Sequence, residues 1–170
     1  MKISFHGAAR TVTGSKHLVQ LNNGENFLLD CGLFQGMGRD TDGLNADFGF
    51  DPKSVNYVIL SHAHIDHSGN LPTLVRLGFA GQILCTPPTA DLTEILLFDS
   101  VNIFLSKQKK KPKRGRGNYG PKPLYLQRDV METVDRFVTI GFNKSFKING
   151  SIELTFIPAG HLLGAAAVII

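Results

Sequence analysis

The segment His62-Ala63-His64-Ile65-Asp66-His67 decides how the rest of this sequence is interpreted. It places three histidines and one aspartate within six residues, directly after an apolar run at residues 55–60. On an extended chain, residues two apart point the same way, so His62 and His64 can reach one ion. Asp66 and His67 are adjacent and project differently, which suits a second ion nearby. Imidazole and carboxylate are preferred zinc ligands, so the segment predicts a two-zinc site.

The alternative interpretation of this segment is a polar loop with exposed histidines. Burying several imidazoles together without a metal would be costly, which favours the metal site. His6 and His17 each stand alone in a strand-like run, and we interpret both as structural histidines. His161 follows another strand-like run and has glycines nearby, which allow a close backbone approach.

The composition indicates one globular domain. The chain has 170 residues, and 42% of them are hydrophobic, which argues against disorder throughout. No stretch is as long and apolar as a membrane span, and the first residues lack the apolar core of a signal peptide, so we expect a cytoplasmic protein that has no membrane contact. Cys31 and Cys85 lie beside strand-like runs and are expected to be buried, reduced thiols.

The positive charge is concentrated in one segment. The net charge is +4, but residues 107–116 carry seven positive charges and no negative ones, so the rest of the chain is net negative. Prolines and glycines interrupt this region, and we expect a basic, mobile loop over residues 107–121. Two interpretations stay open: the charges bind RNA phosphates, or they keep a solvated loop soluble. No aromatic residue lies within 107–116, so base stacking by this segment is not indicated.

The hydrophobic pattern predicts strands followed by alternating strands and helices, which is typical of a layered α/β domain. The expected strands are residues 2–6, 17–21, 27–30, 55–60 and 82–86, then a hairpin over 146–157 that turns at Asn149-Gly150, and a last apolar strand at 165–170. The expected helices are residues 69–77, 89–107 and 127–137.

Two of these helices have a predicted inward face. In the first, Thr89 is the expected cap, and the inward residues are Leu92, Ile95, Leu96 and Ile103. In the second, the inward residues are Val130, Val134 and Phe137.

Six segments together resemble a known family. They are residues 62–67, the turn Gly7-Ala8-Ala9-Arg10-Thr11-Val12-Thr13-Gly14-Ser15, the stretch Leu28-Leu29-Asp30-Cys31-Gly32-Leu33-Phe34-Gln35-Gly36, and residues 89–93, 123–125 and 159–166. The first resembles the signature of the metallo-β-lactamase superfamily. The others, in the same order along the chain, resemble its β-CASP RNA-processing branch.

The resemblance implies an αββα sandwich, of which this chain would be the first part, with two zinc ions in the complete site. His62, His64 and His161 would bind the first zinc, and Asp66 and His67 the second. Asp30 would be a carboxylate that orients the site, and its alternative role is a turn-forming aspartate before Gly32. Asp66, His67 and Asp30 are therefore the expected catalytic residues.

The implied function is cleavage of RNA phosphodiester bonds by a metal-activated hydroxide, in either endonuclease or exonuclease mode. One alternative is another hydrolase of this fold, acting on a thioester, a lactam or a small phosphodiester. Another is a non-catalytic scaffold subunit, although that would be expected to carry substitutions in residues 62–67, and none are present.

Two features depart from the family pattern, namely the point at which the sequence stops and the basic segment at residues 107–116. The family places a metal-bridging aspartate and a final histidine after the third-histidine motif, together with a β-CASP domain, and the sequence stops at Ile170 before any of them. We therefore expect residues 1–170 to be the N-terminal part of a domain that holds one zinc or none and has little activity alone. We also expect the apolar run at 165–170 to leave a sheet edge through which the chain self-associates.

Overall fold

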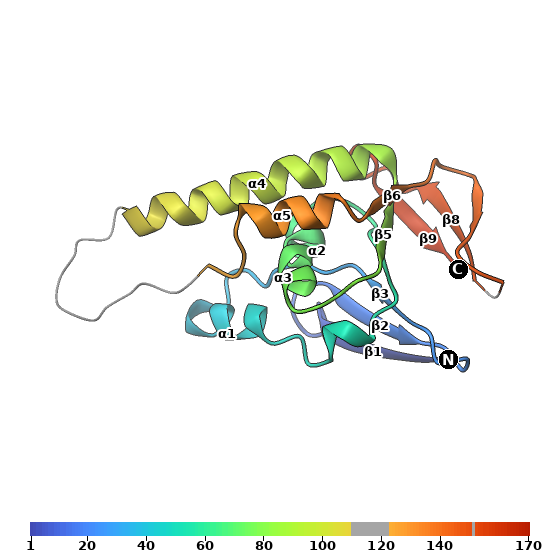
Figure 1. Ribbon diagram of the computed structural model, residues 1–170, viewed down its shortest axis with the longest axis horizontal. Helices are drawn as coiled ribbons and strands as arrows, with labels where there is room; N and C mark the ends of the chain where they lie inside the picture. Colours follow the sequence, from blue (N-terminus) through green and yellow to red (C-terminus); the bar gives the residue numbers. More distant parts are fainter. Residues whose placement is uncertain (110–122, 151) are drawn as a thin grey trace.

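The computed structural model describes residues 1–109, 123–150 and 152–170 (Figure 1), with the backbone alone at 107–109. Its larger sheet has six strands in chain order, β1 (Lys2–Gly7), β2 (Lys16–Gln20), β3 (Asn26–Leu29), β4 (Tyr57–Ile59), β5 (Gln82–Cys85) and β6 (Phe137–Thr139). The pairs β1–β2 and β2–β3 are antiparallel, whereas β3 to β6 run parallel. The carboxyl ends of β3, β4 and β5 therefore meet at one edge, where α/β proteins commonly place their ligands.

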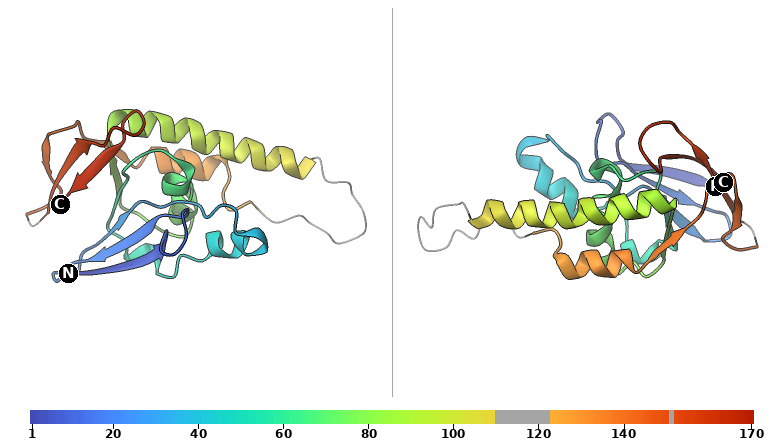
Figure 2. Two further views of the ribbon diagram at one scale, coloured as in Figure 1. Left: turned by 180° about the vertical axis from the view of Figure 1, so that it is seen from behind. Right: turned by 90° about the horizontal axis from the view of Figure 1, so that it is seen from above.

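A second, antiparallel sheet consists of β7 (Ser145–Lys147), β8 (Glu153–Pro158) and β9 (Ala166–Ile169). The helices are η1 (Gly38–Asp40), α1 (Thr41–Ala46), η2 (Pro52–Ser54), α2 (Ile65–Ser68), α3 (Leu71–Arg76), α4 (Pro87–Lys109) and α5 (Gln127–Val134). In Figure 2 the long α4 runs alongside α5, and its carboxyl end, in yellow, lies at the end of the molecule opposite to β8 and β9.

Strands β3, β4 and β5 of the larger sheet are apolar on both faces because each face packs against another layer. Leu28 and Val58 belong to the core under the helices, whereas their neighbours Phe27 and Ile59 belong to the core shared with the smaller sheet. Successive strand residues point to opposite faces, which explains the continuous apolar runs in the sequence. The prediction of a layered α/β domain is confirmed, and the described residues form one helical layer and two sheets of the expected sandwich.

Most predicted elements are present, with shifts of a few residues at their ends. The helix predicted over 69–77 is α3, and it ends before Gly78, whose φ of +108° ordinary side chains rarely adopt. The hairpin over 146–157 is formed by β7 and β8, and β9 pairs with β8. Both cysteines are buried free thiols, as predicted. No helix in the described ranges is long and apolar enough to cross a membrane.

The helix predicted over 127–137 is too long. The structure ends α5 at Val134, and Phe137 opens β6 instead of continuing the helix. The reason is pairing with a distant strand, because the Ile83 N–H donates to the carbonyl of Arg136 at 2.9 Å and β6 then runs parallel to β5. The short helix α1, over Thr41–Ala46, was not predicted at all.

The predicted inward face of α4 is also wrong in part. Ile95 and Ile103 are 64% and 45% exposed, whereas Leu97 and Val101 are buried with Thr93 in a stripe of four-residue spacing. Thr89 does not cap the helix, which already begins at Pro87. The helix continues to Lys109, so the start of the basic segment is helical and not a loop. The rest of the predicted loop, residues 110–121, lies outside the described residues.

Candidate metal centre

The candidate site is assembled from three loops that leave the ends of strands. Asp30 follows β3, residues 61–67 follow β4 and enter α2, and His161 lies in the loop from β8 to β9. The two sheets meet at this point, where the N–H of Ala166 donates to the carbonyl of Ser61 at 2.9 Å. The site therefore lies where the larger and the smaller sheet join.

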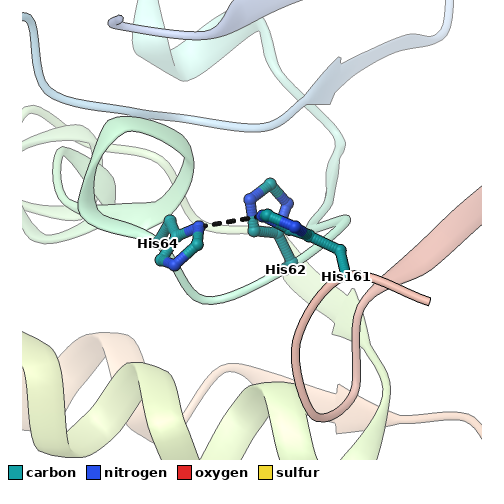
Figure 3. Close-up of side chains that lie close together, drawn as sticks. All are labelled: His62, His64 and His161. Carbon is teal, nitrogen blue, oxygen red and sulfur yellow. Dashed lines mark hydrogen bonds between the residues drawn. The ribbon is translucent and has the colours of Figure 1, made fainter. Parts of the chain in front are cut away.

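Three histidines converge here, His62, His64 and His161 (Figure 3). One ligand atom from each can be chosen so that all three atoms lie within 4.8 Å of one another. Nε2 of His161 is 3.2 Å from Nδ1 of His64, although 97 residues separate them. His62 is half-buried, whereas His64 and His161 are exposed and open the cluster to solvent.

This arrangement fits a bound metal ion. Two nitrogens at about 2.0–2.1 Å from a tetrahedral zinc lie about 3.4 Å apart, close to the spacing of His64 and His161. Three imidazole nitrogens that leave a further position open are a donor set found in catalytic zinc sites. In the described part of the chain, these three histidines form the one such group of three ligands.

The carboxylate of Asp30 joins the two halves of the histidine segment. It is 4% exposed and lies at a φ of +60°, an unusual conformation for a residue other than glycine. It accepts hydrogen bonds from the Ser61 N–H at 2.8 Å and the Ser61 hydroxyl at 2.9 Å. It also lies 2.8 Å from Nδ1 of His67. These contacts fix the orientation of the His67 ring through Nδ1 and leave Nε2 as the nitrogen that could bind a metal.

Ser61 extends the same network to His62. Its hydroxyl oxygen lies 2.9 Å from Nδ1 of His62. Because the hydroxyl gives its one proton to Asp30, the contact requires His62 to carry a proton on Nδ1. Nε2 of His62 is then the unprotonated nitrogen, and it is the one that can bind a metal.

The histidines differ in their pKa. Burial, the largest cause, and the nearby His67, His64 and His161 together lower the pKa of His62 from 6.5 to about 4, against the opposing charge of Asp30. For His67 burial also acts to lower the pKa, but the hydrogen bond to Asp30 and the charges of Asp30 and Asp66 outweigh it, so its pKa is raised. His62 is thus neutral, as a metal ligand must be, at any pH near 7.

Asp66 and His67 form a smaller group beside the three histidines. Nε2 of His67 lies 3.7 Å from a carboxylate oxygen of Asp66, and the His67 and His62 rings are 4.0 Å apart between centroids. Both side chains are partly exposed, with 26% and 25% of their surface accessible. The pair offers one nitrogen and one carboxylate near the first cluster, fewer ligands than the three histidines supply.

The loop carrying His161 is held by two buried threonines. The hydroxyls of Thr86 and Thr89 donate to the carbonyl of Gly164 at 2.7 and 2.9 Å. Gly164 has a φ of +83°, and a Cβ at this position would come within 2.9 Å of both threonines. The amino end of α4 therefore sets the position of the loop, and a larger residue could not replace Gly164 without displacing it.

The α2 segment is held by backbone contacts from the other side. Ser15 donates its N–H to the Asp66 carbonyl at 2.8 Å and accepts the Gly32 N–H at 2.9 Å. The backbone N–H of Cys31 donates to the His67 carbonyl at 2.7 Å. A Cβ on Gly32 would overlap the backbone of Asp66, so this contact requires glycine. Gly32 and Ser15 of the resemblance motifs thus support the backbone around Asp66 and His67.

His6 and His17 lie outside the cluster. His17 contacts the Ser15 hydroxyl at 3.2 Å and packs against Phe5, and His6 packs against Phe50. Sequence reasoning missed Ser61 and Thr86, and it gave Thr89 only a capping role. The position of Ser61 directly before His62 was a usable signal, whereas the contact of Thr86 and Thr89 with Gly164 depends on tertiary structure alone.

The fold and the histidine cluster define an α/β sandwich protein with a group of three histidines that could hold a metal ion. Residues 13–145 match the family described as the Metallo-beta-lactamase superfamily, and the chain belongs to this superfamily. It is 38% identical over 169 residues to ribonuclease TTHA0252 of Thermus thermophilus, covering 99% of this chain and 35% of the relative.

Archaeal relatives are also similar. The transcription termination factor FttA of Pyrococcus horikoshii is 35% identical over 179 residues, covering 99% of this chain and 25% of the relative. The FttA of Methanosarcina mazei is 33% identical over 141 residues, covering 82% of this chain and 20% of the relative. The chain thus spans about a third of the ribonuclease and a fifth to a quarter of the termination factors. These relatives confirm the resemblance to the β-CASP RNA-processing branch.

Solved structures agree on the fold. A B3 metallo-β-lactamase described as having an active-site glutamic acid gives a TM-score of 0.54 at 16% identity, covering 98% of this chain and 53% of that one. A flavo di-iron protein mutant from Thermotoga maritima gives a TM-score of 0.52 at 18% identity, covering 98% and 30%. At such identities the likeness concerns the fold alone.

Proposed function

We propose that this chain supplies the metal-binding core of a zinc-dependent nuclease that cleaves RNA phosphodiester bonds. The observation that carries the proposal is the convergence of His62 and His64 with His161, from loops that belong to different sheets. A spacing of 3.2 Å between nitrogens on residues 64 and 161 is what a shared ion requires.

The residues take the following roles in this proposal. His62, His64 and His161 hold one zinc ion, and Asp66 and His67 contribute to holding a second. Asp30 would keep the His67 ring in place through the contact with Nδ1 at 2.8 Å, which leaves Nε2 as the nitrogen that could bind the metal. Zinc bound here would lower the pKa of a coordinated water and polarise the phosphate.

Two observations support RNA as the substrate. The relatives with 33–38% identity carry the names ribonuclease and transcription termination factor. The seven positive charges of residues 107–116 would also attract a phosphate backbone, and each phosphate contact would add a salt-dependent increment to binding.

The test is zinc-dependent cleavage of RNA by the full-length protein, because residues 1–170 are expected to have little activity alone. Asp66→Asn keeps the shape of the side chain but removes the charge that would bind the metal, so cleavage should fall by more than about 100-fold. Asp99→Asn, an exposed aspartate on α4, is the matched control and should keep the wild-type rate. Undiminished cleavage by Asp66→Asn would remove Asp66 from the mechanism.

The second candidate is a hydrolase of this fold that acts on a thioester, a lactam or a small phosphodiester. It shares the fold and the histidine cluster with the first candidate, whereas the names of the relatives with 33–38% identity favour RNA. Offering the zinc-loaded chain RNA, a thioester and a lactam separately distinguishes the two. Hydrolysis of the thioester or lactam without cleavage of RNA would favour the second candidate.

A further inference from the structure

Loop 159–165, which joins β8 to β9 and carries His161, is held to the rest of the chain close to its end. The carbonyl of Gly164 accepts hydrogen bonds from the hydroxyls of Thr86 and Thr89, at 2.7 and 2.9 Å. Apart from the contact between two of the ligand histidines, these are the hydrogen bonds that join the loop to the rest of the described chain. His161 itself is exposed, so its position depends on how Gly164 is held.

We propose that Thr86 and Thr89 are positioning residues for the first metal ion and that they set its affinity through His161. The inference rests on the proposed function, because it concerns a ligand of the same metal centre. While both hydroxyls hold Gly164, the loop keeps the His161 ring beside the other two ligand rings. Without them the loop would also adopt conformations in which His161 cannot reach the ion. The apparent affinity would then fall in proportion to the population that can still bind.

Burial makes these hydrogen bonds effective in holding the loop. Thr86 and Thr89 are fully buried, and Gly164 is buried as well. A buried carbonyl or hydroxyl that loses its partner cannot turn to water, so breaking either bond costs free energy. A carbonyl oxygen has two lone pairs, and the two hydroxyls occupy both of them. The loop therefore has one favoured position at Gly164.

The geometry at the start of α4 directs the Thr86 hydroxyl to the loop. Thr86 directly precedes the helix, and its carbonyl accepts the Ala90 N–H at 3.1 Å, as the carbonyl of a capping residue does. The hydroxyl of a capping threonine usually accepts a backbone N–H of the first turn. That of Thr86 instead lies 2.7 Å from the Gly164 carbonyl, 78 residues away, and 2.9 Å from the Thr89 hydroxyl. Both contacts belong to the group of three oxygens that fixes the loop.

Substitutions that remove the hydroxyls but keep the shape of the side chains test the proposal. Thr86→Val and Thr89→Val should each weaken zinc binding about 2- to 10-fold, because each removes one hydrogen bond from the loop. The double valine variant leaves Gly164 without a donor and should weaken zinc binding about 10- to 100-fold. Thr86→Ser and Thr89→Ser keep the hydroxyl and should bind zinc as the wild type does. Zinc titration of the full-length protein against a competing chelator measures each affinity.

Thr93 provides a matched control one turn further along α4. It is also fully buried, but its hydroxyl has no hydrogen-bond partner in the described chain. Thr93→Val should therefore leave the zinc affinity unchanged. A second control is the His161→Ala background, in which the ligand itself is absent. There Thr86→Val should cause no further loss of zinc affinity, whereas a general loss of structure would weaken zinc binding in both backgrounds.

Two results would overturn the proposal. One is a zinc affinity of the valine variants equal to that of the serine variants, a comparison that stands even where the double variant does not fold. The other is an equal loss from Thr86→Val with and without His161, which would show that the threonine acts on the fold alone. A wild-type protein that binds no zinc overturns this proposal together with the metal centre. The nuclease proposal fails separately, if the wild type binds zinc and the variants weaken it as expected but RNA is not cleaved.

Discussion

Asp30 brings together groups that lie 31 and 37 residues away in the chain, Ser61 and His67. Replacing it with asparagine keeps the size of the side chain but removes the charge facing His67. We expect Asp30→Asn to lower the pKa of His67. We also expect it to lower the affinity for the metal that His67 would bind by about 10- to 100-fold, as for other residues that orient a metal ligand. Zinc titration against a competing chelator measures the affinity, and NMR titration of the metal-free chain measures the pKa.

The matched control for this prediction is Asp99→Asn, which removes a charge from an exposed position on α4. It should leave both the zinc affinity and the His67 titration unchanged. Wild-type zinc affinity in Asp30→Asn would mean that the aspartate serves the turn before Gly32 and not the metal centre.

His62 gives a pH dependence whose sign follows from its burial. Burial and the neighbouring histidines lower its pKa from 6.5 to about 4 in the folded chain. Between these values the unfolded chain binds a proton that the folded chain does not, so stability falls as the pH drops through this window. His67, whose pKa is raised, contributes in the opposite direction because it favours the folded state at low pH.

A variant isolates the contribution of His62. Urea unfolding of the metal-free chain measures the free energy of unfolding at pH 7 and at pH 5. This free energy should fall from pH 7 to pH 5 in the wild type, and it should fall less in His62→Gln, because glutamine does not titrate. The control is Gln108→Ala, which changes no titrating group and should keep the wild-type difference between the two pH values. His6→Gln is less suitable as a control, because the pKa of His6 is also lowered. An equal loss in wild type and His62→Gln would show that His62 is not held neutral in the folded chain.

At the scale of elements, the short helix α2 depends on a close contact with the loop that follows β3. A Cβ on Gly32 would overlap the carbonyl of Asp66, so Gly32→Ala must shift α2 away from the strand. We expect a loss of stability of about 1–3 kcal/mol, typical of overpacking a buried contact, together with weaker metal binding. Thermal unfolding and zinc titration measure the two effects.

The chain offers a matched control for this variant in another helix. Gly43 lies within α1 and a Cβ there meets nothing within 4 Å. Gly43→Ala should therefore raise stability by up to about 1 kcal/mol, because alanine favours a helix over glycine, and leave zinc binding unchanged. Similar effects of the two substitutions would contradict the role given to the Gly32 contact.

The elements also show what the sequence could and could not predict. The segment at 62–67 was informative because its ligands are close in sequence and follow a buried strand. The strand β6 was missed because its pairing with β5 is made across more than 50 residues, whereas the helical pattern before it is local. The face of α4 was misassigned because Ile95 and Ile103 fit a helical period as well as Thr93, Leu97 and Val101 do. Periodicity gives a spacing, and tertiary packing decides which stripe is buried.

On the scale of the whole molecule, a metal at this site would connect loops that belong to two different sheets. His62 and His64 belong to the loop after β4 in the larger sheet, whereas His161 belongs to the loop between β8 and β9 in the smaller sheet. The apolar core between the sheets and the bond from Ala166 to Ser61 already hold them together. A metal ion would add a bond between the same two layers, so metal binding and the packing of the sheets should be coupled.

This coupling predicts that zinc stabilises the whole chain and that the effect depends on His161. A ligand that binds only the folded state, present at a concentration of about 1,000 times its Kd, raises the free energy of unfolding by about 4 kcal/mol. For a chain of this size that corresponds to a rise in Tm of about 8–16 °C. His161→Ala should lose most of this rise, because the remaining ligands to the first ion, His62 and His64, lie in one loop and no longer bridge the sheets. His6→Ala, a histidine outside the cluster, should keep it. If calorimetry shows the same rise in His161→Ala as in the wild type, the ion is bound by residues 62–67 alone and the sheets are not joined through it.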